Sequence, residues 1–202
     1  GLNIRNVPMK QHLITGYNFQ GDTRYDKRYT KFRVKSKQQG GNVWDLIRDS
    51  SNNNHSVALT GDAEIASDQK VFGRSSLRLH SNGYAFSPDS DDWNFGTGDF
   101  TIDFRIRFAS LAATTQRLSG QWLTATNQRC WLVSLTGTGT NIQVITSTDG
   151  VNATTTLNFA WAPSVNTNYH LAIVRTSGVM KVFVDGTQIG TSQANTDSLF
   201  DS

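Results

Sequence analysis

The clearest pattern in the chain is a strict alternation of apolar and polar residues over FTIDFRIRF, residues 100–108. Phe or Ile occupies every second position, and Thr, Asp or Arg occupies the positions between them. Because successive side chains of a β-strand point to opposite faces, this alternation predicts a strand with one buried face and one face in water. Arg105 and Arg107 fall on the second face, where we expect a hydrated sheet surface and not an anion site.

The remaining sequence after residue 41 contains more strand-like runs, separated by turn signals. Ser177-Gly178 and Asp185-Gly186 are expected to join three short strands within residues 170–190, since Asp-Gly suits a two-residue hairpin turn. The other expected strands are residues 75–81, 83–88, 129–135, 141–148 and 154–160. This spacing of strands and turns predicts an all-β fold, an antiparallel two-sheet sandwich.

Charge divides the chain into two parts. The whole chain has 202 residues and a formal net charge of +3. Residues 1–40 carry nine basic and two acidic groups, whereas residues 41–202 carry ten basic and fourteen acidic groups. The basic part ends at Gly40-Gly41, which resembles a hinge. We therefore predict an extended basic N-terminal arm over residues 1–41 and a sandwich over residues 42–202.

The predicted arm interleaves cations with aromatic rings. We expect it to be a docking segment that becomes ordered on a partner protein. Nucleic-acid binding is the alternative that we do not favour, although cations with stacking rings would suit it. The expected docking residues are Arg24, Tyr25, Lys27, Arg28, Tyr29, Lys31, Phe32 and Arg33.

Three stretches of the sequence carry a family resemblance. They are VWDLIRDSSNNNHSVALTGDAEIASDQKVFGRSSLRLHSNGYAFSP, FGTGDFTIDFRIRF and NYHLAIVRTSGVMKVFVDGTQIG. In this order they resemble the laminin-G-like, concanavalin-A-like jelly roll in the version common in phage and bacterial surface proteins. Tyr169 stands where such families often have Trp. The resemblance covers residues 43–190 and implies a jelly-roll sandwich.

The end of the chain departs from the family pattern. Members usually continue after the Asp-Gly hairpin with a short strand and a closing strand, but this sequence stops at LFDS, residues 199–202. The resemblance thus implies that one or two closing strands are absent and that an edge is left open. We expect a truncated sandwich. Pairing of that edge by a neighbouring chain or by the basic arm is the alternative.

Catalytic groups are sparse, and we expect a protein that is not an enzyme. Glycosidases of this fold resemble one another in placing two Glu and one Asp along a strand, yet Glu64 is the only glutamate here. Asp103 is the only carboxylate in the strand 100–108. Cys130 is the only cysteine and lies in a strand-like run, which predicts a buried, inert thiol. The four histidines, His12, His55, His80 and His170, lie in no nucleophile motif.

Calcium is the one cofactor that the sequence suggests. Asp89, Asp91 and Asp92 lie in SPDSDDWNFG, and loop carboxylates of this kind hold Ca²⁺ in many sandwiches of this type. Residues 48–56 form a second stretch rich in Asp and Asn. A polar turn is the alternative, and we favour it because Asp, Asn and Ser dominate turns for backbone reasons.

Tryptophans near turns are the candidate sugar-binding residues. Trp93, Trp122 and Trp161 lie close to predicted turns, where an aromatic ring can stack on a sugar. Trp44 and Trp131 lie in apolar runs and are expected in the core.

Taken with the resemblance, these features favour a non-enzymatic structural component of a bacteriophage virion, in the capsid, tail or fibre. It would dock on other virion proteins through the arm and display the jelly roll, which would have glycan or a host surface as a further partner. We expect a homo-oligomer, with a trimer as one form, and no membrane span, since no apolar stretch is long enough. The alternative is a secreted carbohydrate-binding or carbohydrate-active module of a bacterial surface protein.

Overall fold

The structure is a computed structural model, and it describes residues 11–14, 34–38, 45–49, 51, 53–71, 75–80, 82–111 and 113–201. The Gly40-Gly41 hinge and all the predicted docking residues lie outside the described residues, so the arm stays a prediction. Those docking residues are Arg24, Tyr25, Lys27, Arg28, Tyr29, Lys31, Phe32 and Arg33. In the part of the chain that is described, no helix has the length and apolar character needed to cross a bilayer.

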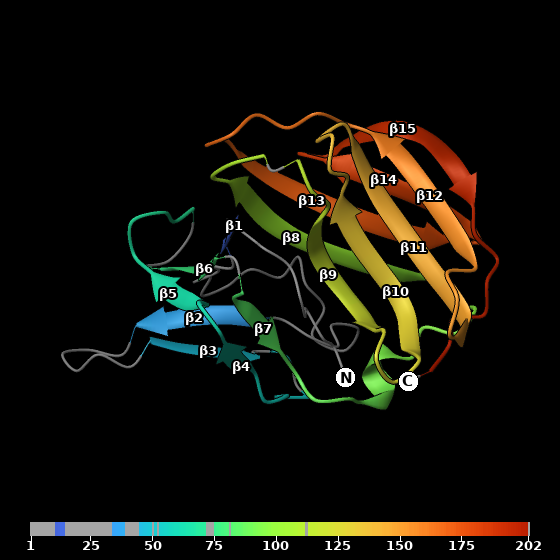
Figure 1. Cartoon of the computed structure of the whole chain (residues 1–202), viewed down its shortest axis with the longest axis horizontal. Coiled ribbons are helices and arrows are strands. Elements are labelled where there is room, and N and C mark those ends of the chain that lie inside the picture. Colours follow the sequence, from blue (N-terminus) through green and yellow to red (C-terminus); the bar gives the residue numbers. More distant parts are fainter. Residues whose placement is uncertain are drawn as a thin grey trace.

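Two antiparallel sheets form the body of the protein (Figure 1). The four-stranded sheet has the order β12-β11-β10-β9, and in Figure 1 it lies in front of the seven-stranded sheet, β15-β14-β13-β8-β1-β6-β5. The strands of the smaller sheet are β9 (Gln116–Leu123), β10 (Gln128–Leu135), β11 (Asn141–Gly150) and β12 (Thr155–Ala160). Those of the larger sheet are β1 (Gln11–Ile14), β5 (Glu64–Ala66), β6 (Ser76–Leu79), β8 (Phe100–Phe108), β13 (Asn168–Thr176), β14 (Val179–Val184) and β15 (Thr187–Ala194). The predicted all-β two-sheet sandwich is confirmed.

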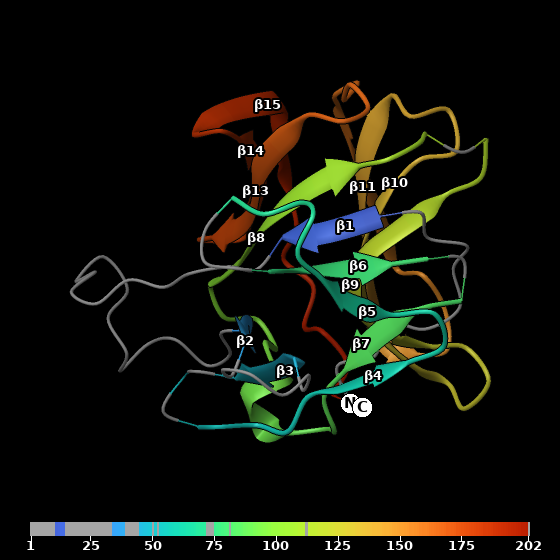
Figure 2. The same ribbon diagram turned by 90° about the vertical axis from the view of Figure 1, so that its left-hand side faces the viewer.

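Two short strand pairs lie at one end of the molecule, beyond the β5 edge of the larger sheet (Figure 2). Strand β2 (Val34–Gln38) pairs with β3 (Asp45–Asp49), and β4 (Ala58–Thr60) pairs with β7 (Tyr84–Phe86). A single turn of 3₁₀ helix, η1 (Asp91–Trp93), follows β7. It is the only helical element among the described residues.

The alternating run 100–108 is strand β8, with the bounds that the sequence predicted. Its apolar side chains face the space between the sheets, where Ile106 and Phe108 are 1% and 0% exposed. Opposite them lie Trp131, Val133 and other residues of the four-stranded sheet, which belong to the same apolar cluster. Burial of these side chains on both sheets is the main stabilising contribution to the sandwich.

The two predicted hairpin turns are confirmed by their backbone angles. Ser177 and Gly178 have φ values of 49° and 71°, and Asp185 and Gly186 have values of 49° and 83°. Positive φ at both central residues matches the twist of the flanking strands. These turns join β13 to β14 and β14 to β15.

Strand β9 was not expected from the sequence. It pairs with β10, and the pairing shifts register between Val133 and Ser134, where Leu118 is the extra residue on β9. A β-bulge of this kind places two successive residues on one face, so the period-two pattern is lost. The bulge and the two buried glutamines in QRLSGQWL together remove the alternation of apolar and polar residues by which a strand is predicted from sequence.

Four residues from the predicted arm take part in the larger sheet. Strand β1 lies between β6 and β8 and pairs antiparallel with both. The predicted boundary near residue 41 stays a prediction, but residues 11–14 are a strand of the sandwich.

A buried arginine ties three segments together at one end of the sandwich. Arg175 is 1% exposed, and its guanidinium lies 4.8 Å from the ring centroid of Phe100. Its Nε donates to the carbonyl of Gly98 at 2.8 Å, and its Nη2 donates to those of Gly96 and Gly98, both at 2.6 Å. Its Nη1 donates to the carbonyl of Asp197 at 3.0 Å. Burial lowers the pKa of this guanidinium, and the nearby carboxylates of Asp197 and Asp99 oppose that shift.

We predict that Arg175→Ala lowers the free energy of unfolding by about 3–5 kcal/mol, because it leaves several buried carbonyl groups without a donor. Arg175→Lys should recover only part of the loss, since an ammonium lacks the planar fork of donors. Urea unfolding followed by circular dichroism measures both.

Arg107→Ala is the control, because Arg107 is half-buried and makes a single 2.7 Å hydrogen bond to Asn166. It should cost about 1 kcal/mol or less. Equal losses for Arg175→Ala and Arg107→Ala would show that the buried network is not a main support of the fold.

Candidate functional site

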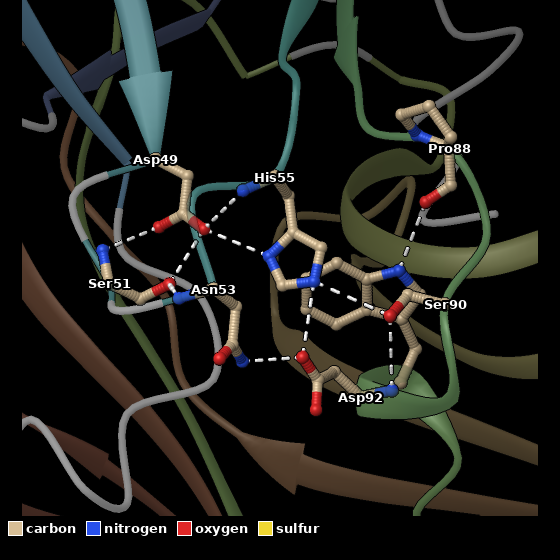
Figure 3. Close-up of polar contacts among 8 residues, drawn as sticks. Asp49, Ser51, Asn53, His55, Pro88, Ser90 and Asp92 are labelled. Atoms are coloured by element: carbon tan, nitrogen blue, oxygen red, sulfur yellow. Dashed lines mark hydrogen bonds and ion pairs between the residues drawn. The ribbon is translucent and has the colours of Figure 1, made fainter.

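A polar network joins the loop after β3 to the helical turn η1 (Figure 3). At its base is Asp49, whose side chain is fully buried. The Asp49 carboxylate accepts hydrogen bonds from the Ser51 backbone N–H at 2.8 Å, the Ser51 hydroxyl at 2.7 Å and the His55 backbone N–H at 2.9 Å. The His55 Nδ1 lies 2.9 Å from the same carboxylate. A buried carboxylate is tolerated because these donors satisfy it.

The other side of the His55 ring faces η1. Its Nε2 lies 3.1 Å from Asp92 Oδ2 and 3.4 Å from the hydroxyl of Ser90. The Asn53 side-chain amide also donates to Asp92 Oδ2. The ring stacks at an angle on Trp93, with centroids 4.6 Å apart. The network thus spans two segments that are more than thirty residues apart in sequence.

The order Asp49, His55, Ser90 is that of a hydrolytic triad, but the distances oppose this function. Asp92 lies closer to Nε2 than the Ser90 hydroxyl does, and both ring nitrogens face carboxylate oxygens. A general base needs a ring nitrogen free to take the proton of the serine. The Ser90 hydroxyl, moreover, accepts a hydrogen bond from the Asp92 N–H. The arrangement holds two loops together and does not activate a nucleophile.

The predicted calcium ligands do not converge. Asp92 belongs to the His55 network, whereas Asp89 accepts a hydrogen bond from Gln121 of β9 at 3.4 Å. Asp91 is exposed in η1. The described residues hold no group of three or more His, Cys, Asp or Glu side chains that could bind a metal ion. Calcium at Asp89, Asp91 and Asp92 stays a prediction.

Two of the three predicted sugar-binding tryptophans lie at the core. Trp93 is 3% exposed and donates its indole N–H to the Pro88 carbonyl at 3.1 Å. Trp161 is half-buried and packs edge-on against Tyr169, with ring centroids 4.9 Å apart. We expected exposed rings at turns. The indole rings instead pack against apolar residues of the core, because burial of a large aromatic ring is favourable.

Trp122 lies on the outside of the four-stranded sheet. Gly120 and Leu132 are paired across β9 and β10, and a Cβ built on Gly120 would lie 3.0 Å from the Leu132 side chain, so both face one side. Trp122 is two residues further along β9 and therefore shares that side. It is 8% exposed, and the guanidinium of Arg129 lies over its ring, 6.0 Å from the ring centroid.

Strand register defines the other residues on this side, which we call the outer face. In the row nearest the β10–β11 turn, Arg117 pairs with Ser134, Ser134 with Gln143, and Gln143 with Asn158. The Gln143 amide donates to the Asn158 side-chain oxygen at 3.0 Å. The outer face comprises Arg117, Gly120, Trp122, Arg129, Leu132, Ser134, Gln143, Ile145, Thr156 and Asn158.

The outer face offers the groups that hydroxyl-rich ligands require. Gln143 and Asn158 supply amides and Thr156 supplies an exposed hydroxyl. Ser134 and Trp122 lie on the same side but are 0% and 8% exposed. The Ser134 hydroxyl is buried and has no hydrogen-bond partner. Arg117 could not be placed on this face from the sequence, because β9 was not recognised as a strand. Arg129 lies in the predicted strand 129–135.

The remaining candidate catalytic groups are engaged elsewhere. Glu64 forms an ion pair with Arg78, 3.0 Å between Oε1 and Nη1, on β5 and β6. Asp103 lies 3.1 Å from Nε2 of His170, across β8 and β13. Cys130 is 0% exposed, and burial raises the pKa of its thiol to about 12. The predicted buried thiol is confirmed, and a thiol with this pKa stays protonated and unreactive near neutral pH.

The sequence model of a family described as Concanavalin A-like lectin/glucanases superfamily matches residues 79–202. No curated protein matches the sequence. Two solved structures are similar in fold. One is of botulinum neurotoxin type C, which depends on interaction with two ganglioside molecules to enter cells. The other is domain 4 of AbnA, an extracellular arabinanase of family GH43 from Geobacillus stearothermophilus, in complex with arabinotriose.

The toxin structure is 14% identical to this chain, with a TM-score of 0.58 over 87% of this chain and 42% of its own. This chain therefore spans about two fifths of the toxin chain. The arabinanase domain is 15% identical, with a TM-score of 0.52 over 75% of this chain and 74% of its own. Identities this low establish a shared fold.

We predict that Asp49→Ala lowers the free energy of unfolding by about 2–3 kcal/mol, because four hydrogen-bonding groups lose their buried acceptor. The matched control is Asp91→Ala, which removes an exposed carboxylate from η1 and should cost about 0.5 kcal/mol or less. Chemical denaturation measures both. If the two variants unfold at the same denaturant concentration, the network does not hold the loop to η1.

Proposed function

We propose that this chain, which belongs to the Concanavalin A-like lectin/glucanases superfamily, binds carbohydrate and has no catalytic role of its own. The observation that carries the proposal is the lectin-like sandwich, which it shares with an arabinanase domain solved with arabinotriose and with a toxin that interacts with gangliosides. Because one fold hosts many functions, the surface chemistry must also suit a saccharide.

The outer face of the four-stranded sheet meets that requirement. Its amides on Gln143 and Asn158 can donate to and accept from sugar hydroxyls, and Thr156 adds a hydroxyl group. These side chains are held on paired strands, so the hydrogen-bonding groups are fixed in place before a ligand arrives.

The positions of the carboxylates support a role without catalysis. Retaining and inverting glycosidases need two carboxyl groups that flank one glycosidic bond. The outer positions of β9, β10, β11 and β12 carry amides, hydroxyls and arginines instead. The His55 network has no available base, because Asp92 engages Nε2.

Glycan-array binding of the full chain tests this proposal, followed by titration of the best ligand. We predict that Gln143→Ala weakens binding about threefold to tenfold, the effect of one or two neutral hydrogen bonds. Gln188→Ala is the matched control, because Gln188 is an exposed glutamine of β15 in the other sheet. It should bind like the wild type. An array with no bound glycan, neutral or acidic, would remove the proposed function.

We propose further that the module belongs to a bacteriophage virion, as a capsid, tail or fibre protein docked through its basic N-terminal segment. Support comes from the phage-like phrases within residues 43–190 and from the charge difference between residues 1–40 and 41–202. A secreted module of a bacterial surface protein is the second candidate. Mass spectrometry of purified particles distinguishes them: we expect the chain in the particle, and finding it only in the secreted fraction would support the second candidate.

A further inference from the structure

We infer that the carbohydrate is a neutral saccharide, and that the side-chain amides of Gln143 and Asn158 bind two neighbouring hydroxyl groups of it. The inference rests on the proposed function and adds to it the chemical class of the ligand and the atoms that recognise it. It follows from the exposure of the outer face, from the hydrogen bonding of the two amides and from the uncharged strands around them.

The outer face is more open over β11 and β12 than over β9 and β10. On β9 and β10, Trp122, Leu132 and Ser134 are 8%, 6% and 0% exposed. The outer positions of β12 are exposed, and those of β11 are half-buried. A ligand can therefore reach this half, which we call the amide surface. It comprises Asn141, Gln143, Ile145, Thr156, Asn158 and Ala160.

Gln143 and Asn158 form a cross-strand pair with one hydrogen bond between their side chains. Gln143 Nε2 donates to Asn158 Oδ1 at 3.0 Å. The other polar atoms of the two amides, Gln143 Oε1 and Asn158 Nδ2, have no hydrogen-bond partner in the described part of the chain. An acceptor and a donor therefore lie next to each other, and the bond between the amides limits rotation of both side chains.

Two neighbouring hydroxyl groups of a sugar complement this arrangement. Each hydroxyl can both donate and accept a hydrogen bond. One hydroxyl can accept from Asn158 Nδ2 while its neighbour donates to Gln143 Oε1. The bond that joins the amides polarises both groups, which strengthens the two new bonds. Thr156 adds a hydroxyl on the same side, two residues along β12 from Asn158.

The strands β11, β12 and β15 together contain one charged residue, Asp149. It lies at the end of β11, where its carboxylate accepts hydrogen bonds from the backbone N–H groups of Val151 and Asn152, each at 2.8 Å. Charged residues commonly make up about 25–35% of a protein surface. The polar groups that these strands offer are instead amides and hydroxyls.

Strand β15 extends the uncharged area around the edge of the sandwich. Gln193 Nε2 donates to the Asn158 carbonyl at 2.7 Å, and a Cβ built on Gly190 would lie 3.2 Å from Phe159 Cα, so β15 lies beside β12 (Figure 1). The Asn158 carbonyl, which a peptide strand added to β12 would use, is therefore occupied. This favours recognition by side chains over the addition of a strand.

An uncharged surface selects against charged ligands. An ion that leaves water loses hydration free energy unless an opposite charge replaces the water. The amide surface offers no opposite charge to an acidic or a basic sugar, whereas its hydrogen-bonding groups can satisfy hydroxyls. Arg117 is in the same row as Gln143, but it is two strands away, roughly 10 Å, beyond the buried Ser134. We therefore expect a neutral ligand.

The test measures binding of the full chain to the neutral polysaccharides dextran, arabinan and galactan and to the acidic polysaccharides polygalacturonate and alginate. We expect binding to at least one neutral probe. Its affinity should change less than about twofold between about 0.05 and 0.5 M NaCl, because salt screens charges. Periodate cleavage of neighbouring hydroxyl pairs, followed by borohydride reduction, should weaken binding of that probe by about tenfold or more.

Variants assign the effect to the amide pair. Asn158→Ala should weaken binding of the neutral probe about threefold to tenfold, as Gln143→Ala does. The double variant should lose less than the product of the two single effects, because the two amides act as a unit. Asn168→Ala is the matched control, since Asn168 is an exposed asparagine of β13 in the other sheet. It should bind within about twofold of wild type. Circular dichroism confirms that each variant is folded.

Each alternative result has a distinct meaning. Binding to acidic probes alone, or an affinity that falls steeply with salt, would overturn the inference and leave the proposed function standing. Neutral binding that is unchanged in Asn158→Ala and in the double variant would also overturn it, since the ligand would then lie elsewhere. Unchanged binding after periodate treatment would overturn the role of neighbouring hydroxyls. No binding to any saccharide would remove both the inference and the proposed function.

Discussion

The interaction on which most of this architecture depends is the buried guanidinium of Arg175. It satisfies carbonyl groups of residues 95–98, which lead into β8, and of the segment after β15. Those two segments meet again where the Leu199 N–H donates to the Gly96 carbonyl at 3.0 Å. An irregular segment can be buried only if its polar backbone groups find partners, and one arginine with five donors provides many of them at a single point.

This arrangement has a consequence for function. With the end of the sandwich closed by Arg175 and the interior filled by one apolar cluster, the sheets act as a rigid support. The outer face of the four-stranded sheet is then free to carry polar side chains in rows set by strand pairing. The His55 network fixes a different region, the loop after β3, to η1 (Figure 3). Support of the fold and the proposed carbohydrate recognition thus use separate residues.

Local pattern allowed prediction of β8 and of the hairpins at Ser177-Gly178 and Asp185-Gly186, because strand alternation and turn geometry depend on neighbouring residues alone. The spacing of strands and turns predicted the two-sheet sandwich, and the family resemblance added the jelly-roll form. Strand β9 escaped prediction because its bulge at Leu118 interrupts the period of two. With β9 unrecognised, Arg117 and the sheet position of Trp122 could not be recognised either.

Contacts between distant residues set the rest of the site. Asp49 and Asp92 were each assigned to a polar turn or a calcium loop, since nothing in the sequence near either residue shows that His55 joins them. Burial of Trp93 depends in the same way on the His55 ring against it. The location of a tryptophan near a predicted turn therefore does not determine whether its indole faces water or the core.

Strand β1 imposes an order on the assembly of the larger sheet. Gln11 pairs with Phe108, 97 residues later, and with Leu79 on the other side. Without β1, the β5–β6 pair has no strand linking it to β8 among the described pairings. A ribosome makes this segment before β6 and β8, so β1 has no partner strand until those strands have emerged. The two parts of the sheet are therefore joined only after β8 is made, and a protein lacking residues 11–14 would fold with its sheet divided in two.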